Sequence, residues 1–198
     1  MLSHYISRNI VAGCDEAGRG CLAGPVVAAA VILPNSFNNS ILNDSKLLSK
    51  KKREQLRFII EKEASSWSIG ISSVREIEKI NISNASFLAM HRAIKKLEIT
   101  PEILLIDGNH FKSYKGIHHK LVVKGDSKYY AIAAASVLAK TYRDNIMINL
   151  DNKYPKYKWK KNKGYPTKEH KLAIQNIGIS AHHRKSFQLV DSKLNLET

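Results

Sequence analysis

The sequence has little cysteine, which argues against a zinc site and against a fold stabilised by several disulfides. Cys14 and Cys21 are the two cysteines among 198 residues. A zinc site needs further thiol or imidazole ligands at short spacing, and no second cluster supplies them. We expect two buried thiols in a reducing compartment; a disulfide between them is the alternative.

Long apolar runs and export signals are also missing. The longest apolar run, VVAAAVIL over residues 26–33, has the length of a strand and is too short to span a bilayer. The first ten residues do not combine a charged start with a long apolar stretch, so we expect no signal peptide. These absences predict a cytoplasmic protein without membrane spans.

Acidic residues are scarce relative to basic ones. The sequence has 17 Asp and Glu against 32 Lys and Arg, which gives a formal net charge of +15. An excess of this size predicts a polyanionic partner such as nucleic acid. A lysine-rich composition can also arise from the base composition of the coding DNA, so charge alone does not identify the partner.

Apolar periodicity predicts one mixed α/β sheet with helices on its faces. After about Leu150 the sequence becomes dense in lysine and aromatic residues. We therefore expect a catalytic core over residues 1–150 and a basic, mostly helical extension over residues 151–198, packed together as a single structural unit. Strands are expected over 9–16, 25–33, 67–74, 102–108 and 119–126, and helices over 49–65, 83–99 and 127–150.

Four carboxylates lie at or just after the ends of predicted strands. Asp15 and Glu16 end the first strand, Asp107 ends the fourth, and Asp126 ends or follows the fifth. Ligands of open α/β sheets bind outside the carboxyl ends of the strands, where these side chains would meet. Oxygen ligands alone favour Mg²⁺ or Mn²⁺ over zinc. Taken singly, Asp107 is equally typical of a turn, and Asp126 of a helix N-cap.

Asp144 lies too far along the predicted helix to join these acids at one ion. It is 18 residues beyond Asp126, which is roughly 27 Å of continuous helix at about 1.5 Å per residue. Its spacing of four residues from Lys140 predicts an ion pair within the helix.

Several segments in order resemble the type 2 ribonucleases H, the ribonuclease HII family. They are GCDEAGRGCLAGPVVAAAVIL, LNDSKLLS, LLIDGN, VVKGDSKYYAIAAASVLAKTYRD, NKGYPTKEH and HRKSF. The resemblance implies a ribonuclease H-like fold and a metal-dependent endoribonuclease. Such an enzyme hydrolyses the RNA strand of RNA–DNA hybrids and cuts 5′ of ribonucleotides embedded in duplex DNA. Its products carry 3′-hydroxyl and 5′-phosphate ends, and it serves ribonucleotide excision repair and DNA replication.

The resemblance also assigns roles to individual residues. Asp15, Glu16, Asp107 and Asp126 would form the catalytic acidic cluster and hold Mg²⁺ or Mn²⁺ in a two-metal arrangement. Gly18, Arg19 and Gly20 would lie against the nucleic-acid backbone beside the scissile phosphate. Ser45 and Lys46 would contact phosphates of the DNA strand, and Tyr165 would pack on a sugar at the RNA–DNA junction. We expect a monomer, and no pattern for a replication-clamp partner is readable near the C-terminus.

Two alternatives stay open at this point. One is another ribonuclease H-like metal nuclease such as ribonuclease HIII, which carries an additional N-terminal substrate-binding domain; here about a dozen residues precede the first acids. The other is a non-catalytic module that binds hybrids, which we would expect to have lost at least one of the four acids.

Overall fold

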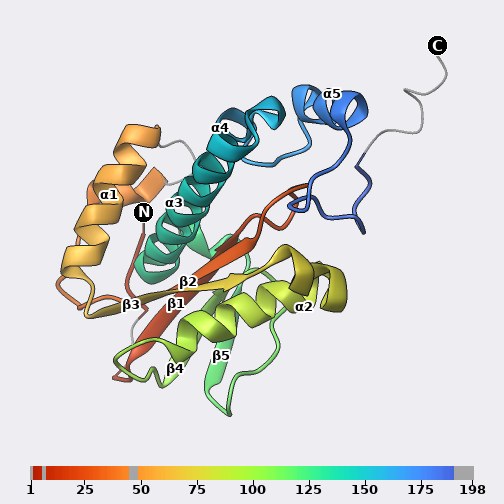
Figure 1. The fold of residues 1–198 in the computed structure, drawn as a ribbon. Helices are drawn as coiled ribbons and strands as arrows, with labels where there is room; N and C mark the ends of the chain where they lie inside the picture. Colours follow the sequence, from red (N-terminus) through yellow and green to blue (C-terminus); the bar gives the residue numbers. More distant parts are fainter. Residues whose placement is uncertain (1, 6–7, 45–48, 190–198) are drawn as a thin grey trace.

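A five-stranded mixed sheet forms the middle layer of the protein, whose computed structural model describes residues 2–5, 8–44 and 49–189 (Figure 1). The strand order is β3-β2-β1-β4-β5. The pairs β1–β2 and β2–β3 are antiparallel, whereas β1–β4 and β4–β5 are parallel. This topology confirms the predicted mixed α/β class. The strands are β1 (Val11–Ala17), β2 (Val26–Ile32), β3 (Ser66–Ser72), β4 (Ile103–Asp107) and β5 (His118–Val122).

Helices cover both faces of the sheet. Helices α1 (Lys50–Glu63) and α3 (Tyr130–Lys153) lie on one face, and α2 (Val74–Lys95) lies on the other (Figure 1). Every residue of β2 is buried, which explains its continuous apolar sequence. Helix α3 lies directly on β1, because a Cβ atom at Gly13 would come within 2.2 Å of the Ala131 backbone.

The ends of the helices follow local capping signals. Ser49 caps α1: its side chain accepts a hydrogen bond from the Lys52 amide. Helix α2 begins at Val74, nine residues before the predicted start at residue 83. Ser73 and Glu76 form a reciprocal capping box there, and Asn81, with φ 65° and ψ 168°, interrupts the helix. The third strand, predicted over 67–74, wrongly includes Ser73 and Val74, where α2 begins.

The C-terminal extension contains three short helical segments and packs against the end of α3. Tyr157 and Trp159 are buried with Met147 of α3 and with Leu22 and Ala23, which follow β1 in the chain. The proposed division at residue 150 falls inside α3 and stays a prediction. The helical segments of the extension are η3 (Pro155–Tyr157), α4 (Trp159–Asn162) and α5 (Lys168–Ile177).

Two further expectations concern the cysteines and membrane-spanning helices. Cys14 and Cys21 are both buried and free. In the described part of the chain, no helix combines the length and the apolar character needed to cross a membrane.

Candidate active site

Three of the predicted acids lie together at the carboxyl ends of β1 and β4. These strands are parallel neighbours, and Cys14 is paired with Ile106, so Asp15 and Asp107 come next at the same level. Glu16 follows, and its charge and that of Asp107 act on the Asp15 carboxyl. We call Asp15, Glu16, Asp107 and Asp126 the acidic edge.

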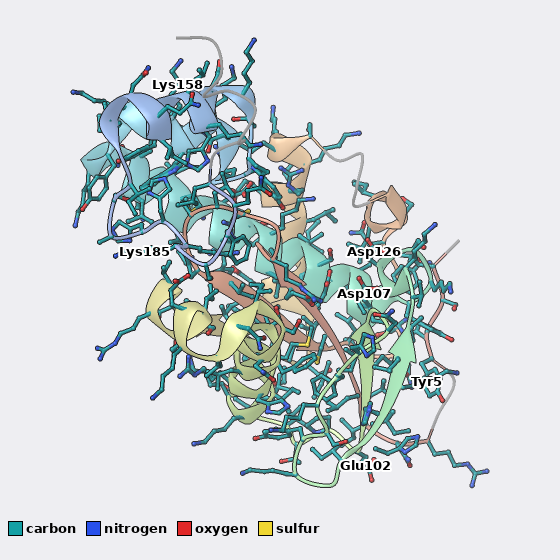
Figure 2. The ribbon with its side chains drawn as sticks, turned by 90° about the vertical axis from the view of Figure 1, so that its right-hand side faces the viewer. Tyr5, Glu102, Asp107, Asp126, Lys158 and Lys185 are labelled. Atoms are coloured by element: carbon teal, nitrogen blue, oxygen red, sulfur yellow. The ribbon has the colours of Figure 1, made fainter. Side chains whose placement is uncertain are left out.

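Asp126 lies in a short 3-10 helix, η2 (Gly125–Ser127), that follows β5. The Gly125 amide donates a hydrogen bond of 2.7 Å to Asp107 Oδ1, which brings the next residue, Asp126, beside β4. Figure 2 shows Asp107 and Asp126 at the same end of the sheet and Glu102 at the opposite end of β4. Asp126 is 5% exposed, and the N-cap residue of α3 is Tyr129, so the N-cap interpretation of Asp126 is wrong.

Asp15 is held in a buried and electrostatically unfavourable position. Its side chain is 7% exposed, accepts a 2.7 Å hydrogen bond from the Glu16 amide and is hydrogen-bonded by Ser136 of α3. Burial raises the pKa of Asp15 well above its ordinary value, and the charges of Glu16 and Asp107 raise it further. The position therefore favours either a proton or a cation on this carboxylate.

Glu16 has a partner of opposite charge in the following turn. Arg19 Nη1 lies 3.2 Å from Glu16 Oε1, with the arginine side chain about half exposed. Burial raises the pKa of Glu16, Arg19 lowers it, and Asp107 adds to the rise. Arg19 thus places a cation at the acidic edge, where it pairs with Glu16.

The donor chemistry of the acidic edge fits a hard divalent cation. Among the side chains that the structure describes, no three Asp, Glu, His or Cys groups stand together ready to hold a metal ion. The edge nevertheless presents oxygen ligands only, and Asp15 is both buried and repelled by its neighbours. Mg²⁺ and Mn²⁺ prefer carboxylate oxygens and would neutralise this repulsion.

The other predicted site residues lie in two loops next to each other. Gly18, Arg19 and Gly20 form the turn after β1, and Tyr165, which is 45% exposed, follows α4. The Leu22 amide donates a 2.8 Å hydrogen bond to the Gly164 carbonyl and joins the two loops. Ser45 and Lys46 lie outside the described residues.

The sequence interpretation missed residues that hold these loops. Ser136 contacts Asp15, and the buried side chains of Arg143 and Arg184 lie behind the turn after β1. Arg143 had a readable signal, because it lies four residues after Ala139 and four before Met147 on the buried face of α3.

The predicted ion pair of Asp144 with Lys140 is wrong. Arg53 of α1 lies beside α3 and places its Nη2 3.8 Å from Asp144 Oδ2. Packing of the two helices thus supplies a partner that spacing within α3 could not indicate.

The mixed sheet, its flanking helices and the acids at the ends of adjacent parallel strands place this chain among the ribonuclease H-like α/β proteins. A family model described as Ribonuclease HII matches residues 12–190. The chain is 60% identical over 196 residues to the ribonuclease HII of Parabacteroides distasonis, over 99% of this chain and 98% of that relative. The chain belongs to the ribonuclease HII family, endoribonucleases that act on RNA–DNA hybrids.

Solved structures share the fold. The PCNA:RNase HII complex from Archaeoglobus fulgidus gives a TM-score of 0.77 at 25% identity, over 94% of this chain and 98% of that chain. Bst-RNase HIII in complex with Mn²⁺ gives a TM-score of 0.71 at 16% identity, over 94% of this chain and 70% of that chain. The likeness thus extends over nearly the whole of this chain.

Proposed function

We propose that this endoribonuclease hydrolyses the RNA strand of hybrids and cuts 5′ of ribonucleotides embedded in duplex DNA, with 3′-hydroxyl and 5′-phosphate products. The observation that carries the proposal is the parallel register of β1 and β4, which places Asp15 and Asp107 side by side at one sheet edge, with Glu16 next in the chain. Buried carboxylates that lack compensation destabilise a fold, so such a cluster indicates a functional site that binds a cation.

Asp15, Glu16, Asp107 and Asp126 would hold Mg²⁺ or Mn²⁺. Two such ions, when bound, supply a water of lowered pKa and stabilise the leaving 3′ oxygen. The carboxylates provide hard oxygen ligands, and Ser136 and the Glu16 amide orient Asp15. The Mn²⁺ bound to the structurally similar ribonuclease HIII supports the choice of metal.

Gly18, Arg19 and Gly20 would contact the strand at the scissile phosphate. A glycine-rich turn lets peptide groups approach the substrate, where they can bind a 2′-hydroxyl as donor and acceptor. Arg19 would bind a phosphate, and the exposed ring of Tyr165 would pack on the junction sugar. Ser45 and Lys46 remain proposed contacts to the DNA strand.

We further propose that the enzyme acts in the cytoplasm as a monomer, with residues 1–150 as catalytic core and residues 151–198 as basic extension. The archaeal ribonuclease HII was solved in complex with PCNA, which supports a test for a ring-shaped clamp partner here. Size-exclusion chromatography of the protein alone and with a bacterial clamp tests the monomer and the complex together.

The decisive experiment uses end-labelled duplexes containing one ribonucleotide, a long hybrid or DNA only. We expect cleavage 5′ of the single ribonucleotide with Mg²⁺ or Mn²⁺, none with a chelator, and none of the DNA duplex. Binding of the hybrid without cleavage under every metal condition would instead favour a binding module. Cleavage of hybrids but not of the single ribonucleotide would favour an activity of the ribonuclease HIII kind.

A further inference from the structure

Two arginines have fully buried side chains behind the turn formed by Gly18, Arg19 and Gly20. Arg143 of α3 is 2% exposed, and Arg184, near the C-terminus, is 0% exposed. A buried guanidinium is costly unless its donors are used, so their partners indicate what the charges are for.

Arg143 joins the segment after β1 to the loop that carries Tyr165. Its Nε donates to the Pro25 carbonyl at 3.0 Å and its Nη2 to the Ala23 carbonyl at 3.1 Å. Its Nη1 donates to the Lys163 carbonyl at 2.8 Å, and its guanidinium carbon lies 5.9 Å from the centre of the Tyr165 ring. One side chain thus contacts both loops.

Arg184 binds the carbonyls of the turn itself. Its Nη2 donates to Gly18 at 2.7 Å and its Nη1 to Arg19 at 2.8 Å. Nε and Nη2 also donate to the Gly24 carbonyl, at 3.0 and 2.9 Å. These hydrogen bonds direct the carbonyls of Gly18 and Arg19 toward the interior and hold the turn to the C-terminal segment.

Gly18 leaves room for the Arg143 side chain to pack against the turn. Its φ is +97°, and a Cβ atom there would lie 2.0 Å from Arg143 Nε. The planar fork of arginine matches several fixed carbonyls at once, which the single ammonium of lysine does not do.

We propose that Arg143 and Arg184 are positioning residues that hold the Gly18–Gly20 turn and Tyr165 as one rigid unit, so that both meet the same ribonucleotide. The inference rests on the proposed function, because it concerns how that substrate is aligned. Misalignment of about 1 Å can cost on the order of 100-fold in rate, whereas phosphate contacts elsewhere preserve affinity.

The kinetic test compares Arg143→Lys with the control Arg57→Lys. Arg57 of α1 also stacks on a tyrosine, with its guanidinium carbon 4.2 Å from the centre of the Tyr142 ring of α3, and it pairs with Glu61 of α1. On a duplex with one ribonucleotide we expect Arg143→Lys to lower kcat at least about tenfold and to leave KM within about twofold. The control is expected to keep both constants. Arg184→Lys should behave like Arg143→Lys.

Amide hydrogen exchange supplies a readout that does not need activity. Leu22 and Gly24 donate backbone hydrogen bonds to Gly164 and His182, so their amides report the joined loops. Arg143→Lys should accelerate exchange at both amides while α2 exchanges as in wild type. A variant that is merely less stable would accelerate exchange throughout the fold.

A double-mutant cycle with Gly18→Ala sharpens the test. In the Arg143→Lys background the added methyl group meets a shorter, more flexible side chain, so Gly18→Ala should lower kcat by a smaller factor than in wild type. Unchanged kcat and unchanged exchange in both lysine variants would overturn the inference. If the wild type cuts no ribonucleotide substrate, the proposed function fails, and the exchange result still decides whether the arginines hold the loops.

Discussion

The acidic edge and the histidine network of the C-terminal extension solve the problem of buried polar groups in opposite ways. The acidic edge gathers groups of like charge: burial raises the pKa values of Asp15 and Glu16, and the charge of Asp107 raises both further. The histidine network, by which we mean Trp159, His170, Ser180 and His183, pairs each donor with an acceptor. Without a cation, the acidic edge lowers the stability of the fold, and a bound cation would offset its repulsion. The histidine network forms its hydrogen bonds within the protein and needs no ligand.

The hydrogen bonds of the histidine network assign both imidazoles as neutral. The Ser180 amide donates to His183 Nδ1 at 2.9 Å, which leaves the proton of His183 on Nε2. His170 Nε2 accepts from Trp159 Nε1 at 3.0 Å and lies 3.2 Å from His183 Nε2, so it is the acceptor for both. His170 Nδ1 donates to the Tyr165 carbonyl at 2.9 Å, and the network thereby fixes the backbone of that loop.

The largest expected effect comes from removing a charge at the acidic edge. Asp107→Asn should lower cleavage of a duplex with one ribonucleotide by at least about 1,000-fold, because groups that act as a unit lose activity together. Affinity for the same duplex should change little, since phosphate contacts dominate binding. Single-turnover cleavage and a binding titration with chelator measure the two effects. Cleavage near the wild-type rate would exclude Asp107 from the site.

Acid should loosen the histidine network. Burial, together with a smaller contribution from the charge of His170, lowers the pKa of His183 from 6.5 to about 4. The unfolded chain therefore binds more protons between these values, so stability contributed at higher pH is lost as pH falls from 6.5 toward 4, by on the order of 2 kcal/mol. Denaturant unfolding against pH checks this. His183→Gln should flatten the slope in this window; an unchanged slope would contradict the assignment.

Tyr165 is bound through its backbone carbonyl to the histidine network, while its ring is a proposed substrate contact. Tyr165→Ala should lower cleavage at a single ribonucleotide about tenfold, as expected for a lost stacking contact. Its ring is 45% exposed, so the thermal midpoint should move by less than about 2 °C. Parallel activity and thermal melts compare the losses. Equal fractional losses of folded protein and of activity would make Tyr165 a structural residue only.

The smallest effect is a gain in stability at the acidic edge. Asp15→Asn removes a carboxylate whose pKa is raised in the fold, so near neutral pH it should stabilise the protein by about 1 kcal/mol, or about 2–4 °C. The gain should vanish as pH falls toward 3.8, where the unfolded carboxyl also becomes protonated. Mg²⁺ should stabilise the wild type more than the variant. If Asp15→Asn lowered stability at every pH, the conclusion that Asp15 is electrostatically unfavourable in the fold would be wrong.

The sequence predicted what local chemistry determines and missed what depends on tertiary packing. The apolar run of β2 and the serine before α1 indicated their elements directly. The spacing of Ser73 and Glu76 is that of a capping box, but the strand predicted over 67–74 includes Ser73 and so hides the start of α2. Residues that act across the fold were not readable as partners: Arg53 reaches Asp144 from another helix, and Arg184 binds carbonyls more than 150 positions away.

The sequence indicates the positions of Asp15 and Asp107 in the acidic edge more directly than that of Asp126. Strand ends suggested that Asp15 and Asp107 would meet, and the parallel register of β1 and β4 supports this. The position of Asp126 depends on a hydrogen bond from Gly125 to Asp107 and on the short helix η2, which periodicity does not reveal. The roles of these residues stay a prediction until the variants are measured.

The register between β1 and β4 has a consequence for how this enzyme tolerates change. Asp15 and Asp107 are separated by two strands, two long helices and several loops, yet their spacing depends on the pairing of Cys14 with Ile106. Insertions or deletions in the intervening loops should therefore leave the two carboxylates in place. A slip of one residue in β4 would turn Asp107 to the opposite face of the sheet and remove it from the site.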